Sequence, residues 1–268
     1  MKSYALAQFI SIATAGCSLD TFSSPRSDLT LRSAGGYGYD GLNEPLAWHK
    51  LSANNSLCAT GKNQSPINLV PSKELTIDGS SLAFQLYSYP EGGELENLGN
   101  TVQVQVNGSI MLDNWVYNLV QFHFHTPSEH HLMGEHFPLE VHFVAQNDAG
   151  SLAIIAFFVE IAIGDDRISS FLTAVLSRVK EVPQSGQIFL TGALNHTDLQ
   201  YHLSQSDVYQ YNGSLTTPPC SEHVFFNVVA SPLYLHPREY RALKKIMKYN
   251  SRYTQNRPGQ DNLLSRRI

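Results

Sequence analysis

The sequence of 268 residues is poor in several residue types and patterns, and each shortage excludes a class of protein. Only 15% of the residues are charged, and 18 Lys and Arg face 23 Asp and Glu with no basic stripe, which argues against nucleic acid or an anionic membrane as partner. No segment approaches the ~20 apolar residues of a membrane-spanning helix. With 42% hydrophobic residues the chain is neither disordered nor collagen-like. We therefore expect a globular protein whose partner is a small molecule.

Cysteine is scarce, with three residues in the whole chain. Residues 1–15 carry a positive charge, a short apolar stretch and two small residues at alternate positions, a pattern typical of a secretory signal peptide. If Cys17 leaves with the signal, Cys58 and Cys220 remain, and an even count suits an oxidising compartment and a single disulfide. We therefore predict a secreted or extracellular protein, with a cell wall or a periplasm-like space as alternatives.

Five glycosylation sequons fit a secreted glycoprotein, although sequons alone decide nothing. They begin at Asn54, Asn63, Asn107, Asn195 and Asn212.

The pattern along the chain predicts one folded domain over residues 37–268, preceded by a flexible leader over 16–36 that is rich in Ser, Thr and Gly. No second linker, repeat or charge block interrupts this domain. Runs rich in β-branched and aromatic residues predict strands, and two segments with a 3.6-residue apolar period predict helices. The fold class is mainly β with peripheral helices (α+β), around a large central, mostly antiparallel twisted sheet. The expected strands are 101–106, 117–125, 139–146, 152–160 and 224–230, and the expected helices lie in 168–179 and after Pro237.

Histidine is the one residue type in excess, with eleven residues. In the segment from Gln121 to His125, strand alternation directs His123 and His125 to one face and two phenylalanines to the other. Glu140 and His142 alternate in the same way on a second predicted strand. The segment between the two strands is long enough for them to pair antiparallel. Three neutral imidazoles with an open fourth position are typical of a catalytic zinc site, whereas a structural site adds a fourth protein ligand. The alternative is an ordinary core or surface histidine pair.

Five separate segments, in order and at compatible spacing, make the chain similar to the α-class carbonic anhydrases over essentially all of residues 37–268. Each segment alone is weak evidence for the family, but the five together argue strongly against another family. The segments are 64–68, 121–125, 128–130, 140–142 and 214–219.

The resemblance implies a carbonate dehydratase, a zinc lyase in which zinc-bound hydroxide converts CO2 reversibly to bicarbonate and a proton. It places Zn²⁺ on His123, His125 and His142. It makes Gln121 and Glu140 the hydrogen-bond acceptors that orient the imidazoles, the role that such neighbours have in metal sites. The oligomeric state stays open.

The resemblance also assigns the residues around the metal. The Thr216 hydroxyl is expected to donate to an ionised Glu129, which then aims the hydroxide at CO2. Tyr39 is expected to hold the water network, and Asn100 stands where the best-known members have a proton-shuttle histidine. The resemblance pairs Cys58 with Cys220, as in secreted members. The CO2 pocket is expected to comprise Val144, Ile154, Leu215, Thr217 and Phe226.

Two other functions compete with this interpretation. One is a catalytically silent carbonic-anhydrase-like binding domain, which would keep the fold and lose metal ligands. The other is a zinc esterase that uses the same nucleophile. The three histidines, Glu129 and Thr216 favour the lyase, because site residues rather than the fold decide function.

Overall fold

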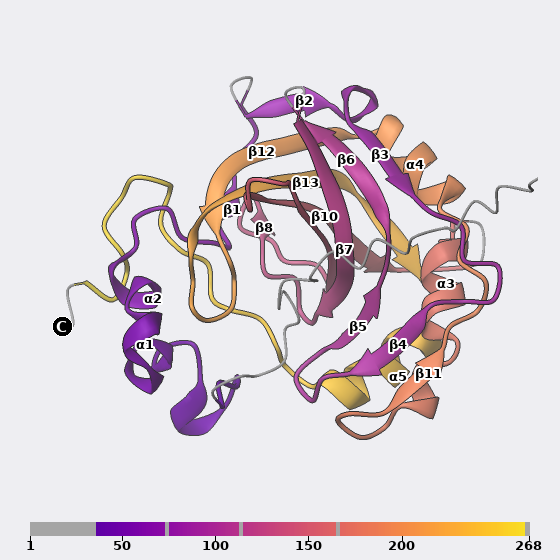
Figure 1. Ribbon diagram of the computed structural model, residues 1–268, viewed down its shortest axis with the longest axis horizontal. Helices are drawn as coiled ribbons and strands as arrows, with labels where there is room; N and C mark the ends of the chain where they lie inside the picture. Colours follow the sequence, from indigo (N-terminus) through magenta and orange to yellow (C-terminus); the bar gives the residue numbers. More distant parts are fainter. Residues whose placement is uncertain (1–35, 73–74, 113–114, 165–166, 266–268) are drawn as a thin grey trace, which may run out of the picture. The chain divides into compact units, whose positions relative to one another are not determined.

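A twisted sheet of eleven strands dominates the structure (Figure 1). The structure is a computed structural model that describes residues 36–72, 75–112, 115–164 and 167–265. The strand order is β11-β4-β5-β7-β9-β10-β13-β12-β2, and β6 pairs with both β3 and β7. All these pairs are antiparallel except β10 with β13. The predicted fold class is therefore confirmed.

The strands of this sheet are β2 (Thr76–Asp78), β3 (Ala83–Leu86), β4 (Glu94–Asn97), β5 (Val102–Gln105), β6 (Gly108–Leu112), β7 (Trp115–His125), β9 (Leu139–Gln146), β10 (Leu152–Ile161), β11 (Ile188–Leu190), β12 (Asp207–Ser214) and β13 (Glu222–Leu235). A separate parallel pair joins β1 (Asn68–Leu69) to β8 (His131–Leu132). The helices are α1 (Trp48–Leu51), α2 (Leu57–Thr60), α3 (Ser170–Leu176), α4 (Thr197–Ser204) and α5 (Pro237–Met247). Short 3₁₀ turns are η1 (Gly41–Asn43), η2 (Ala53–Asn55), η3 (Gly79–Ser81) and η4 (Val179–Glu181).

Each of the five predicted strands is present. The prediction for 139–146 coincides with β9, while β7 and β13 extend beyond the segments expected for them. Both predicted helices form, and α5 starts at Pro237, whose fixed φ and missing N–H suit the first turn of a helix. The predicted signal peptide and all but the last residue of the leader lie outside the described residues and stay predictions.

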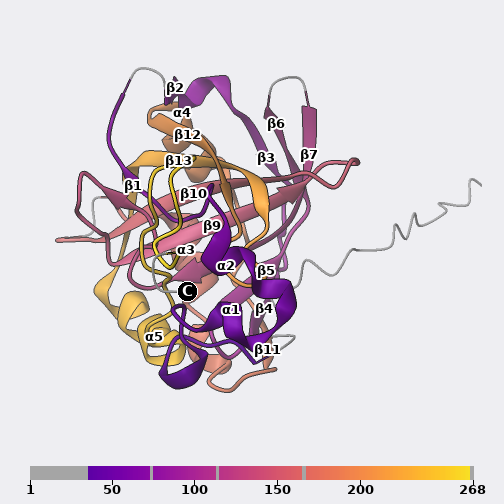
Figure 2. The same ribbon diagram turned by 90° about the vertical axis from the view of Figure 1, so that its left-hand side faces the viewer.

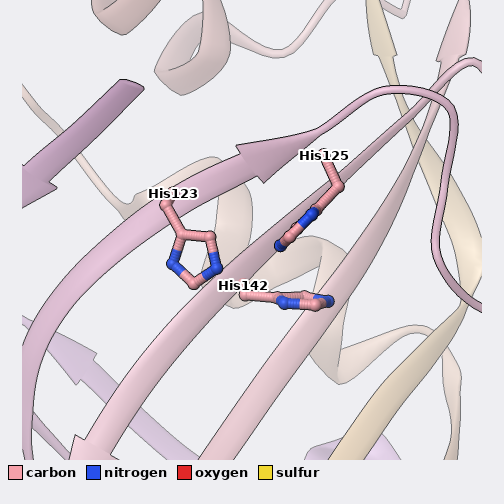
Figure 3. A group of neighbouring side chains, drawn as sticks. All are labelled: His123, His125 and His142. Atoms are coloured by element: carbon pink, nitrogen blue, oxygen red, sulfur yellow. The ribbon is translucent and has the colours of Figure 1, made fainter. Parts of the chain in front are cut away.

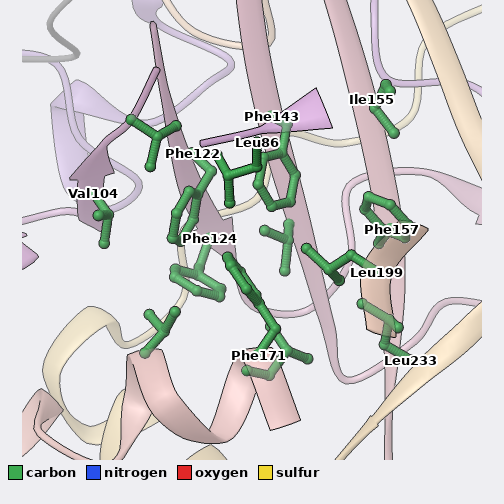
Figure 4. Close-up of a cluster of buried hydrophobic side chains, with 14 of the residues drawn as sticks. Leu86, Val104, Phe122, Phe124, Phe143, Ile155, Phe157, Phe171, Leu199 and Leu233 are labelled. Carbon is green, nitrogen blue, oxygen red and sulfur yellow. The ribbon is translucent and has the colours of Figure 1, made fainter. Parts of the chain in front are cut away.

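Alternation along the central strands separates two apolar clusters. On β7, β9 and β10, one set of alternate residues joins the larger cluster, which includes Phe122, Phe143 and Phe157 (Figure 4). The residues between them face the other way, where Val144 and Ile154 join a smaller cluster. Polar side chains on these strands therefore share a face with the smaller cluster.

Helices α3, α4 and α5 cover the larger cluster. Apolar residues of all three helices are buried in it, such as Phe171 of α3, Leu199 of α4 and Leu243 of α5. Figure 1 shows the three helices on one side of the sheet. Among the described residues, none of the helices has the length and apolar character needed to cross a membrane. The opposite face is thus left to the smaller cluster and the polar residues.

A disulfide joins Cys58 of α2 to Cys220, which confirms the predicted pairing. Both cysteines are fully buried and pack with Trp48 of α1 in a third apolar cluster. Helices α1 and α2 lie side by side in Figures 1 and 2. The bond therefore ties the start of the described chain to the loop that follows β12.

We expect a Cys58→Ala/Cys220→Ala variant to lose free energy of unfolding, by at most about 5 kcal/mol, because the native bond closes 162 residues of the unfolded chain. Urea unfolding of the wild type with and without reductant measures the loss, and the double variant, which should not respond to reductant, is the control. An equal unfolding midpoint for reduced and oxidised wild type would contradict the prediction.

Candidate metal centre

Three histidines from two neighbouring strands converge on the face opposite the larger cluster (Figure 3). In the antiparallel register of β7 and β9, His123 lies opposite His142, and His125 lies opposite Glu140. All three imidazoles are at least 97% buried. The alternation of β7 thus brings its two histidines beside that of β9, as the sequence predicts.

Each imidazole uses one nitrogen to contact the protein. Nδ1 of His123 lies 2.9 Å from Oε1 of Gln121. Nδ1 of His125 lies 2.9 Å from the backbone oxygen of Asn250, and Nε2 of His142 lies 2.7 Å from Oε1 of Glu140. Because the amide, carbonyl and carboxylate oxygens accept, these nitrogens carry the protons. The other nitrogen of each ring is left with its lone pair.

The remaining nitrogens suit one metal ion. One ligand atom from each of His123, His125 and His142 can be chosen so that the three lie within 4.8 Å of one another. Nε2 of His125 is buried and has no hydrogen-bond partner, which is costly unless a ligand binds it. A second group, His130 with Glu140 and His142, has the same spacing. Its carboxylate is already engaged by four donors, so the first group is the better site.

Burial keeps two of the three imidazoles, those of His123 and His125, neutral. Desolvation lowers the pKa of His123 well below its usual range, with a further contribution from the neighbouring imidazoles. The same cause lowers the pKa of His125 to about 3. Neutral imidazole is the form that binds metal, so at neutral pH these two rings need no deprotonation.

Glu140 is the centre of a buried hydrogen-bond network. Oε1 accepts from His142 and, at 2.6 Å, from Nδ1 of His130, while Oε2 accepts from the backbone N–H groups of Glu129 and His130. Burial favours the protonated acid, yet the two imidazoles hold the pKa of Glu140 well below its usual range. Nε2 of His130 lies 2.7 Å from the Tyr211 hydroxyl, so His130 connects the carboxylate to β12.

A second buried carboxylate, Glu129, lies beside the histidines. Its Oε1 accepts from the backbone N–H of Arg252 at 2.9 Å and lies 3.4 Å from Nδ1 of His125, and its Oε2 lies 4.0 Å from Nδ1 of His142. Desolvation raises the pKa of Glu129, and interactions with Arg252 and the Thr216 hydroxyl oppose this shift. Thr216 thus lies near Glu129, but Oε2 of Glu129 has no hydrogen-bond partner, so the donation expected from Thr216 stays a prediction.

The residues predicted for the substrate pocket are four apolar residues and Thr217, and the apolar ones lie on the face of the sheet that carries the histidines. Val144, Ile154 and Phe226 belong to the smaller cluster, and Leu215 packs against it. The ring of Phe226 lies edge-on to His142, with ring centroids 5.9 Å apart. Thr217, the remaining residue of the set, is also buried.

A second tyrosine, Tyr37, interacts with Asn100 at the predicted shuttle position, while the role expected for Tyr39 stays a prediction. Burial raises the pKa of the Tyr37 hydroxyl, and hydrogen bonding with Asn100 and Thr217 partly opposes this shift. Tyr39 packs edge-on against Tyr37 and Trp48. Two tyrosines separated by one glycine are equivalent in the sequence, and only the folded backbone distinguishes them.

Two further site residues, Asn250 and Arg252, follow α5 in a segment without a recognisable motif. Asn250 accepts from His125 through its backbone oxygen, and its side chain bonds the backbone of Phe124 and Thr126. Arg252 is buried, donates to the backbone oxygens of Ser65 and Cys58, and has its pKa lowered to about 10 by desolvation. Backbone acceptors leave no residue-type signal, so the acceptor for His125 could not be found from sequence.

Comparison with known proteins gives concordant results. Residues 43–266 match the sequence profile of the eukaryotic-type carbonic anhydrases. A carbonic anhydrase of Pectobacterium carotovorum is 36% identical over 226 residues, which are 84% of this chain and 86% of that protein. The solved fungal α carbonic anhydrase of Aspergillus oryzae is 44% identical, covers 86% of this chain and 98% of its own, and has a TM-score of 0.82. The α carbonic anhydrase of Thermovibrio ammonificans, solved with the inhibitor sulfanilamide, is 30% identical, covers 85% of this chain and 98% of its own, and has a TM-score of 0.70.

We expect Tyr211→Phe to lower the free energy of unfolding by about 1–3 kcal/mol, because the lost hydroxyl lies within hydrogen-bond distance of His130 and, at 2.8 Å, of Ser65, both buried. Urea unfolding measures the change. Tyr209→Phe, on the same strand and of similar burial, is the matched control and should change stability less. Equal losses in the two variants would show that the network contributes nothing specific.

Proposed function

The chain belongs to the eukaryotic-type, or α-class, carbonic anhydrase family and is a carbonate dehydratase; on that premise we propose that it hydrates CO2 with a zinc ion held by His123, His125 and His142. The convergence of three buried imidazoles, each with one nitrogen hydrogen-bonded to the protein and the other available to a ligand, carries this proposal. Three nitrogen ligands are the donor set of catalytic zinc sites, which keep a fourth position for water or substrate.

Zinc, when bound, would lower the pKa of a bound water to roughly 7 and so supply a nucleophile at neutral pH. The protein's own contribution is positioning. The oxygens of Gln121, Asn250 and Glu140 hold the three imidazole tautomers, so that the lone pairs point inward.

Glu129 and Thr216 are proposed to orient the attacking oxygen. The hydroxyl proton of Thr216 is directed to Glu129, which leaves the threonine oxygen as an acceptor toward the nucleophile. This favours an ionised Glu129. Desolvation raises the pKa of Glu129, whereas a bound divalent metal ion and the Arg252 guanidinium would both lower it and so favour the ionised carboxylate.

The apolar residues next to the histidines are proposed to receive CO2. Val144, Ile154, Leu215 and Phe226 offer a surface without donors or acceptors, which suits a small molecule with no net charge. Bicarbonate carries a charge and is less stable against such a surface. This difference favours entry of the substrate and departure of the product.

No specific observation favours either of the two alternative functions. A silent binding domain would lack part of the ligand set, whereas His123, His125 and His142 are all in place. An esterase would share the same nucleophile, so a CO2-hydration assay beside an ester-hydrolysis assay separates the two.

We also propose that the protein works outside the reducing cytoplasm. The Cys58–Cys220 disulfide supports this, since such bonds persist in oxidising compartments. Mass spectrometry of protein from the intact source, without reduction, tests it.

We expect the wild type to contain one zinc per chain and His142→Ala to lose both the metal and CO2 hydration, because two imidazoles remain of three. Metal analysis of the purified protein and stopped-flow CO2 hydration measure the two losses. His136→Ala removes an exposed histidine outside the cluster and is the control, which should keep both. Stoichiometric zinc and an unchanged rate in His142→Ala would refute the ligand assignment.

We expect proton release to limit turnover, because the amide of Asn100 does not titrate near neutral pH, whereas imidazole has a pKa of about 6.5. The maximal rate should rise with the concentration of imidazole-type buffer at fixed pH and ionic strength, while kcat/KM for CO2 stays constant. Asn100→His should be faster than wild type in dilute buffer and lose most of that advantage in concentrated buffer.

Asn100→Gln is the matched control for this experiment, since it changes size without adding a titratable group. A wild-type rate that is already independent of buffer would mean that another side chain carries the proton. His131 and His223 are the first to test.

A further inference from the structure

A cavity of about 390 Å³ lies apart from the metal centre, lined by residues of α5, its preceding residue His236, and η4. Its charged lining is entirely basic: Lys180 comes from η4, and Arg238, Arg241 and Lys245 come from α5. None of these residues belongs to the candidate metal centre. The sequence has no continuous basic stripe, and folding brings these cations together from two segments.

The spacing of the helical cations explains how they meet. Arg238, Arg241 and Lys245 follow one another at intervals of three and four residues, so they lie along one face of α5. The opposite face carries Leu243 and Met247, which are buried in the larger cluster. The helix is therefore held by its apolar side while its basic side is exposed.

The positive charge of this cavity is largely uncompensated. Arg238 pairs with Glu239, Nη2 to Oε1 at 2.7 Å. In the part of the chain that the structure describes, no carboxylate forms an ion pair with Lys180, Arg241 or Lys245. The whole chain carries a net charge of −5, so this cluster is opposite in sign to the molecule as a whole. Like charges held together repel unless an anion binds between them.

The chemistry of the lining selects the anion. Arginine presents a planar fork that matches phosphate with two parallel hydrogen bonds, and lysine adds a mobile point charge. The cavity has the volume of a small-molecule site, and Pro237 and Ala242 supply a short apolar wall. We propose that this cavity binds a small anion with two or more phosphate groups, because one phosphate would leave part of the positive charge unpaired.

Isothermal titration of the full chain with inorganic tripolyphosphate tests the proposal, with citrate as the carboxylate comparison. We expect one tripolyphosphate per chain, weaker binding as NaCl rises because salt screens exposed charges, and clearly weaker binding of citrate. Arg241→Gln/Lys245→Gln should weaken tripolyphosphate binding by about tenfold or more, since it removes two charge-assisted contacts.

The matched control is Lys50→Gln/Arg257→Gln, which removes two exposed cations elsewhere and should leave the affinity unchanged. An equal loss in the control would show that binding reports only total charge and would overturn the site. Absence of binding, or citrate binding as tightly as tripolyphosphate, would overturn it as well.

A measurement on the wild type avoids any effect of substitution on folding. Acetylation of lysines, followed by mass spectrometry, should slow at Lys180 and Lys245 when tripolyphosphate is present, and should be unchanged at Lys50 and Lys62. Equal protection of all four lysines would contradict a site at α5.

Discussion

The two-residue alternation of buried strands is the constraint on which the site depends. On β7 and β9, the residues that face α3 are apolar, and those between them include imidazoles, an amide and a carboxylate. Neither set can be shifted alone, because a slip of one residue would place phenylalanines in the metal site and histidines in the larger cluster. The packing of the core therefore sets the register of the ligands, and stability and metal binding share one cause.

Burying so many polar groups is costly, and the network around Glu140 shows how the cost is met. Each oxygen of this carboxylate accepts from two donors, and His130 extends the chain of contacts to Tyr211 and Ser65. A buried charge is tolerable when it is hydrogen-bonded in this way. The polar atoms left without partners include Nε2 of His125 and Oε2 of Glu129, both beside the expected metal. These two atoms without hydrogen-bond partners therefore lie where a metal ion and a molecule bound to it would contact them.

Helix α5 joins several features of the molecule. Its apolar face closes the larger cluster, its basic face lines the separate cavity, and the chain that follows it supplies Asn250 and Arg252. These last two residues contact His125 and Glu129. The position of α5 against the sheet therefore bears on the geometry of the metal centre.

The residue pattern alone determined the mainly β fold, the faces of β7 and β9, and the histidine set, because alternation is a local property of a strand. Family resemblance added the Cys58–Cys220 pair, which the structure contains, and the expectation that Thr216 donates to Glu129. Only the tertiary structure decided that Tyr37 interacts with Asn100, that a backbone oxygen of Asn250 orients His125, and that Lys180 joins the cations of α5. Those features depend on backbone positions and on residues distant in sequence, for which residue type carries no signal.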